Sequence, residues 1–94
     1  MKKQKFASVW DAIEPSRTAA ANMKARAETM IAIEEAVAAW KVTQAAAAKK
    51  LGLTQPRMND LLRGRINKFS LDALINLATR AGLSVRVEIG RKAA

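Results

Sequence analysis

Residues 43–64, TQAAAAKKLGLTQPRMNDLLRG, decide the fold, because their spacing fits two short helices joined by a glycine turn. Ala48 lies four residues before Gly52, and a small side chain there allows the second helix to cross over the first. Gly52 stands where the chain must reverse, so we expect a positive φ, which costs glycine little. Three apolar residues are expected to bury the second helix: Met58, Leu61 and Leu62. The stretch therefore predicts a helix-turn-helix whose second helix has a polar outer face.

The composition indicates a small protein without thiol or metal chemistry. The chain of 94 residues forms one domain with a modest core, and it lacks cysteine, histidine and tyrosine. Disulfides, thiolates and the usual nitrogen and sulfur ligands of metals are therefore excluded. The remaining serines, carboxylates and lysines form no recognisable catalytic set. We predict that the protein is not an enzyme and that it needs no cofactor.

The net charge of +9 is concentrated in and after the same stretch. Residues 1–40 carry six basic and five acidic groups, whereas residues 41–65 carry six basic groups and one acidic group. Such a balance favours polyanions through the release of counterions. No apolar run approaches the roughly 20 residues of a membrane span, and acidic groups stand where a secretion signal needs an apolar segment. We expect a cytoplasmic protein with no membrane partner.

Helical periodicity predicts a mainly α fold of about five helices followed by one C-terminal strand. The expected helices cover residues 6–13, 16–40, 43–51, 54–63 and 70–82. Pro15 is expected to end the first, and residues 16–40 form either one helix or two with a break. The residues suited to cap the last three helices are Thr43, Thr54 and Ser70. The single domain, 1–94, then comprises an N-terminal helical region, a helix-turn-helix core and a strand with its tail, at residues 1–40, 41–82 and 83–94.

Residues 84–89, SVRVEI, change to a period of two, which is the pattern of a half-buried strand. A single strand needs a partner for its N–H and C=O groups, and a second copy of the chain supplies one. In an antiparallel pair about a twofold axis through Val87, Arg86 of one copy lies opposite Glu88 of the other. Three apolar side chains then share one face: Val85, Val87 and Ile89. We therefore expect a homodimer joined by this strand; a disordered tail and an internal pair with residues 3–9 are the alternatives.

The outer face of the second helix carries the candidate side chains for recognising bases. At 100° per residue, it presents Pro56, Arg57, Asn59, Asp60 and Arg63, with Gln55 in the exposed first turn. Gln55 and Asn59 suit the edge of adenine, and Arg57 suits that of guanine. Asp60 is able to accept from cytosine, but a pair with Arg57 or Arg63 is favoured, because phosphates repel a free carboxylate. The predicted base-reading residues are Gln55, Arg57, Asn59 and Asp60.

A second set of residues is expected to contact phosphates, which position a protein on DNA without specifying sequence. Gln44 begins the preceding helix and offers both an amide side chain and a backbone N–H. The predicted phosphate contacts are Gln44, Thr54, Arg63, Arg65 and Lys68. Lys41 and Lys49 are further candidates, although a solvated surface is at least as well supported for Lys49 and Lys50.

Residues 43–82 resemble the XRE-type helix-turn-helix family of lambda repressor-like and Cro-like regulators. The resemblance is carried by Thr43, Gln44, Ala48, Gly52, Thr54, Gln55, Asn59, Leu61, Arg63, Gly64, Ser70, Leu71, Leu74, Leu77 and Gly82. It implies that Gln44 holds a phosphate and that the start of the second helix enters the major groove. Pro56 departs from the family pattern, since a side chain that hydrogen-bonds a base often stands there. The expected function is a sequence-specific transcriptional regulator, favoured as a homodimeric repressor on a palindromic operator.

The flanking segments resemble a smaller group of that family, the HigA-like antitoxins, which also neutralise a small mRNA-cleaving toxin. SVWDAIE at residues 8–14 and the expected strand after Gly82 carry this narrower resemblance. A free-standing regulator without a toxin partner and a protein–protein interaction module are the alternatives. Phe6, Trp10 and Met23 are candidates for a toxin-binding surface, but completion of the core is the favoured role of the first 40 residues.

Overall fold

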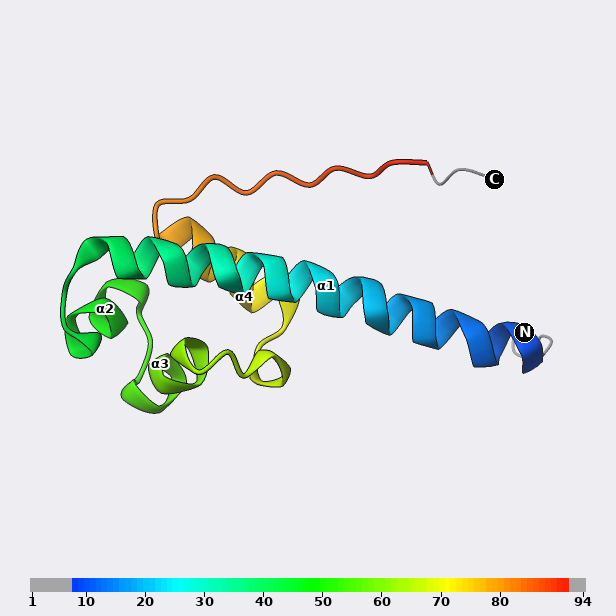
Figure 1. Cartoon of the computed structure of the whole chain (residues 1–94), viewed down its shortest axis with the longest axis horizontal. Coiled ribbons are helices and arrows are strands. Elements are labelled where there is room, and N and C mark those ends of the chain that lie inside the picture. Colours follow the sequence, from blue (N-terminus) through cyan, green and yellow to red (C-terminus); the bar gives the residue numbers. More distant parts are fainter. Residues whose placement is uncertain (1–7, 92–94) are drawn as a thin grey trace.

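The structure, a computed structural model, describes residues 8–91, with side chains from Arg17 onward (Figure 1). Four α-helices follow one another: α1 (Ser8–Trp40), α2 (Gln44–Leu51), α3 (Gln55–Leu62) and α4 (Leu71–Arg80). A short 3-10 turn, η1 (Ile66–Lys68), lies between α3 and α4. The predicted mainly α fold is confirmed, but these residues form four α-helices and not about five.

Helix α1 continues through Pro15, so the predicted end of a helix at this residue is wrong. The helices expected at residues 6–13 and 16–40 are one helix of 33 residues beginning at Ser8, and residues 1–7 lie outside the described part. A proline removes one backbone hydrogen bond and crowds the preceding turn. It does not end the helix here because the alanine-rich sequence that follows favours helical propagation.

Capping residues set the starts of the three short helices. The hydroxyl of Thr43 accepts a hydrogen bond from the backbone N–H of Ala46 at 3.1 Å. Ser70 and Thr54 accept equivalent bonds from the residues three positions ahead, at 3.1 and 3.4 Å. All three predicted caps are confirmed. Each cap satisfies a backbone N–H that has no acceptor within its own helix.

The core lies where the C-terminal half of α1 packs against the shorter helices. Met58 and Leu61 of α3 are fully buried, as predicted. The other large side chains of this core include Met30, Ile33, Leu51, Phe69 and Leu74. The predicted burial of Leu62 is wrong, since this residue is 41% exposed. Leu62 is the last residue of α3 and lies 100° around the helix from Leu61, away from the packed face.

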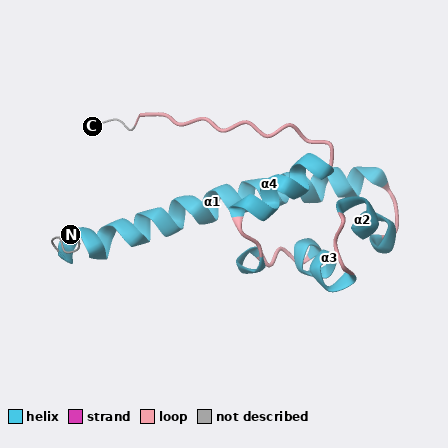
Figure 2. Ribbon diagram, turned by 180° about the vertical axis from the view of Figure 1, so that it is seen from behind, coloured by secondary structure: helices cyan, strands magenta, loops and turns pink. Residues whose placement is uncertain are grey.

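The N-terminal half of α1 extends beyond the other helices (Figures 1 and 2). Residues 17–24 are all exposed, and within residues 17–40, whose side chains are described, the first buried one is that of Met30. Of the residues whose side chains are described, those that complete the core, the favoured role of the first 40 residues, lie in the C-terminal half of α1. The side chains of Phe6 and Trp10 lie outside the described part.

Residues 83–91 are extended and return toward the N-terminal half of α1 (Figure 2). The predicted strand at residues 84–89 is not formed in this single chain, and no strand occurs within residues 8–91. An extended segment becomes a strand only when a second segment shares its hydrogen bonds. Val87 and Ile89 are 70% and 88% exposed, so the apolar side chains of this segment are largely uncovered.

Candidate nucleic-acid interface

The turn between α2 and α3 brings the two helices together as the sequence predicts. Gly52 has a φ of +72°, and the backbone N–H of Leu53 donates to the carbonyl of Ala48 at 2.8 Å. Ala48 is 4% exposed, in agreement with its predicted place at the helix crossing. An added Cβ at Gly52 would lie 2.6 Å from Nη1 of Arg80 in α4, so the Arg80 side chain packs closely against this turn.

The start of α3 presents an exposed polar turn. Gln55 and Pro56 are both exposed, and Asn59 is half-buried on the next turn. Pro56 is tolerated because the first N–H groups of a helix have no intrahelical acceptor. These residues lie on the outer side of a helix whose inner side is fixed by Met58 and Leu61, so Gln55 is accessible to a ligand in solution.

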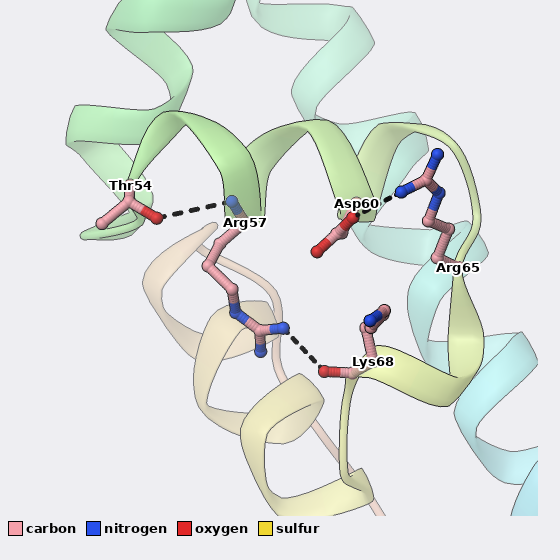
Figure 3. A network of polar contacts seen from close by, with 5 residues as sticks. All are labelled: Thr54, Arg57, Asp60, Arg65 and Lys68. Carbon is pink, nitrogen blue, oxygen red and sulfur yellow. Dashed lines mark hydrogen bonds and ion pairs between the residues drawn. The ribbon is translucent and has the colours of Figure 1, made fainter.

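The side chain of Arg57 points toward Lys68, in the segment that follows α3 (Figure 3). Its Nη1 donates a hydrogen bond of 2.7 Å to the backbone carbonyl of Lys68. The guanidinium carbon lies 4.1 Å from the centroid of the Phe69 ring, a cation–π contact. Phe69 is 2% exposed, so Arg57 covers the outer side of a core residue. The side chain therefore joins α3 to η1.

Asp60 pairs with a partner that the sequence did not predict. Its Oδ1 accepts a hydrogen bond from Nη1 of Arg65 at 3.1 Å, instead of pairing with Arg57 or Arg63 (Figure 3). Arg65 follows the reversal at Gly64, whose φ of +69° turns the chain back along α3. The arginine side chain is 48% exposed, so this ion pair contributes little to stability, but it does offset the carboxylate charge beside the candidate DNA surface.

The predicted phosphate contacts all lie on the surface. All five are exposed: Gln44, Thr54, Arg63, Arg65 and Lys68. Gln44 is the first residue of α2, where backbone N–H groups point outward. Lys50 instead packs over the ring of Trp40, with 4.1 Å between Nζ and the ring centroid. The proposed roles of these residues toward DNA stay predictions.

Arg26 of α1 holds the segment after α3 from the inner side, a contact that the sequence analysis missed. Its Nη1 donates to the carbonyl of Ile66 at 3.1 Å and to that of Phe69 at 3.4 Å. Arg26 shares a helical face with Met30 and Ile33, four and seven residues later. The sequence does indicate such a contact, because a charged residue on the buried face of a helix needs a hydrogen-bond partner.

An apolar hollow of about 340 Å³ lies beside this segment. It is lined by Met23, Ala27, Met30, Ile31 and Glu34 of α1 together with Gly64 and Ile66. Ile31 and Met23 are 53% and 45% exposed. Desolvation at this site raises the pKa of the Glu34 carboxyl above its ordinary value. The hollow is a surface depression at the side of α1 and is separate from the polar start of α3.

Comparisons with known proteins agree with this geometry. A family model described as a helix-turn-helix domain matches residues 13–90. A solved structure assigned to the XRE family of transcriptional regulators superposes with a TM-score of 0.71 at 25% identity, covering 76% of this chain and 80% of that chain. No curated protein gives a significant sequence match. Within the described residues, no helix is long and apolar enough to cross a membrane.

The fold and the α2–α3 geometry define a helix-turn-helix protein, and the chain belongs to the helix-turn-helix domain family. The similarity to the solved structure confirms the more particular resemblance to XRE-type regulators that residues 43–82 indicate. The HigA-like subgroup stays a prediction.

Proposed function

We propose that this protein regulates transcription by binding double-stranded DNA in a sequence-specific manner, with the start of α3 in the major groove. The observation that carries the proposal is the exposed polar start of α3, held outward by the buried Met58 and Leu61. Three exposed cationic side chains follow α3 in the chain: Arg63, Arg65 and Lys68. This arrangement suits base contacts at the helix start and phosphate contacts from the segment that follows the helix.

The proposed regulator is a homodimeric repressor. Residues 84–89 are extended and have unpaired backbone groups, as an intermolecular antiparallel pair requires. In the single chain, Arg86 and Glu88 lie 3.9 Å apart with both side chains more than 80% exposed, so either is able to exchange its partner for one on a second copy. A twofold dimer would place two α3 helices in successive major grooves of a palindromic operator, roughly 34 Å apart. Occupancy of the operator would then block transcription.

A salt titration tests DNA binding by the purified protein. We expect the logarithm of the association constant for a duplex to fall linearly and steeply with the logarithm of salt concentration, because basic side chains release counterions from phosphates. Selection from a random duplex library at moderate salt should then enrich a palindrome. Absence of binding to any duplex at low salt would contradict the proposal, and binding without enrichment of any sequence would contradict base recognition.

One observation favours a second function, the antitoxin of a toxin–antitoxin pair. The apolar hollow beside Met23 and Ile31 has a size and exposure suited to an apolar side chain of a protein partner. The test is coexpression with the product of the adjacent reading frame. We expect relief of toxicity by the wild type and loss of relief on combining Met23→Lys with Ile31→Lys, with DNA binding retained. A non-toxic neighbour would favour a free-standing regulator.

A further inference from the structure

We infer that Arg57 is a positioning residue for Lys68 and not a base-reading residue, so that recognition of bases falls to the amide side chains of Gln55 and Asn59. The inference rests on the proposed function. The preferred DNA is then a half-site whose contacted base pairs are A·T, because the amides of glutamine and asparagine pair bidentately with adenine.

Two contacts hold the guanidinium of Arg57 in place. A charged guanidinium donates to the Lys68 carbonyl at 2.7 Å and stacks on the ring of Phe69 at 4.1 Å. Charge-assisted hydrogen bonds are stronger than neutral ones, and the planar fork of arginine satisfies both contacts at once. To reach a guanine, Arg57 would have to give up both contacts and uncover Phe69, which is otherwise 2% exposed.

The segment that Arg57 contacts is fixed from two sides. Residues 66–69 have four carbonyls, and three of them accept hydrogen bonds from guanidinium groups of distant elements. Arg26 of α1 donates to the carbonyls of Ile66 and Phe69, and Arg57 of α3 donates to that of Lys68. Such a fixed backbone sets the point from which the exposed Lys68 side chain extends, relative to α3 (Figure 3).

This connection has a consequence for DNA binding. Lys68 is a predicted phosphate contact, and Gln55 is a predicted base contact on the helix that carries Arg57. Phosphate contacts fix the register of a protein on the duplex, and base contacts depend on that register. Arg57 therefore couples the two sets of contacts through the backbone of η1 without touching a base.

Replacement of Arg57 by methionine tests the inference on the duplex selected by the wild type. Methionine retains a long apolar stem and removes the donors and the charge. We expect Arg57→Met to weaken binding by about tenfold, and by the same factor on every duplex with one base pair exchanged. A loss that disappears when one particular G·C pair is exchanged would overturn the inference, since that pattern identifies a base-reading residue.

A double-mutant cycle with Lys68→Met separates positioning from general loss of stability or charge. If Arg57 acts through Lys68, Arg57→Met should weaken binding by about tenfold in the wild type but by no more than about twofold in the Lys68→Met background. Arg63→Met is the matched control, because it removes an exposed arginine from the end of the same helix. Its effect should be equal in both backgrounds. Equal losses for Arg57→Met in both backgrounds would overturn the positioning role.

All affinities are measured well below the unfolding temperature of each variant. If Arg57→Met does not fold, Arg57→Lys keeps one donor and the charge, and it should show a smaller uniform loss of about threefold. The outcomes also separate this inference from the proposed function. A wild type that binds no duplex contradicts the proposed function, whereas a wild type that binds normally with a base-specific loss for Arg57→Met contradicts only the role of Arg57.

Discussion

Replacement of Gly52 by alanine is expected to lower the free energy of unfolding by about 1–2 kcal/mol, because left-handed backbone strains an L-residue. The φ of Gly52 is +72°, and the added Cβ would lie 2.6 Å from Nη1 of Arg80. That nitrogen is the end of a flexible, exposed side chain, so it moves aside with little further loss. Backbone strain at the turn between α2 and α3 is therefore the larger effect.

Urea unfolding followed by circular dichroism measures this loss, which corresponds to a fall in Tm of about 4–16 °C for a domain of this size. Gly82→Ala is the matched control: its φ is +87° and no atom lies within 4 Å of the added Cβ, so it isolates the backbone strain. The free energy of unfolding should fall by a similar amount in both variants. A Gly52→Ala protein as stable as the wild type would refute the strain argument, and so would a loss that Arg80→Ala fully restores.

Four further variants test the interface, the dimer and the hollow. Gln55→Ala should weaken binding to the selected operator far more than binding to random duplex, measured by fluorescence anisotropy; equal losses would exclude base recognition by Gln55. Arg65→Ala should weaken both and flatten the salt slope by about one unit; an unchanged slope would show that Arg65 makes no phosphate contact. Val87→Pro should yield a monomer in analytical ultracentrifugation, because proline removes a ladder hydrogen bond; an intact dimer would rule out the strand pair. Burial raises the pKa of Glu34, so the native state binds its proton more tightly and stability falls as pH rises through that raised pKa. Glu34→Gln should remove this loss of stability with rising pH and raise Tm at pH 7. A lower Tm at pH 7 would contradict the desolvation of the Glu34 carboxyl.

The local features of the fold could be predicted from sequence because their causes lie within a few residues. Thr43, Thr54 and Ser70 cap the helices that follow them, and Gly52 has the predicted positive φ. Such contacts depend on side chains three residues from the backbone groups that they satisfy. Pro15 is the local exception, since the rule that prolines end helices neglects the strength of the helix that follows.

Features that depend on tertiary contacts could not be predicted in the same way. Helical periodicity gives the direction of the Cβ of Arg57, but a long side chain is able to turn back and cover Phe69. Arg65 reaches Asp60 only because the chain reverses at Gly64. The strand at residues 84–89 has the right pattern, yet a pattern of side chains supplies no partner for the backbone.

The central claim is that α3 recognises bases in the major groove, and the most direct test replaces single purines of the selected half-site by their 7-deaza analogues. These analogues lack the N7 acceptor of the major groove and retain Watson–Crick pairing. We expect the substitution at an adenine contacted by Gln55 to weaken binding by about 1–3 kcal/mol in the wild type and to leave Gln55→Ala unaffected. Equal binding of the wild type to the natural and all 7-deaza duplexes would contradict base recognition by α3.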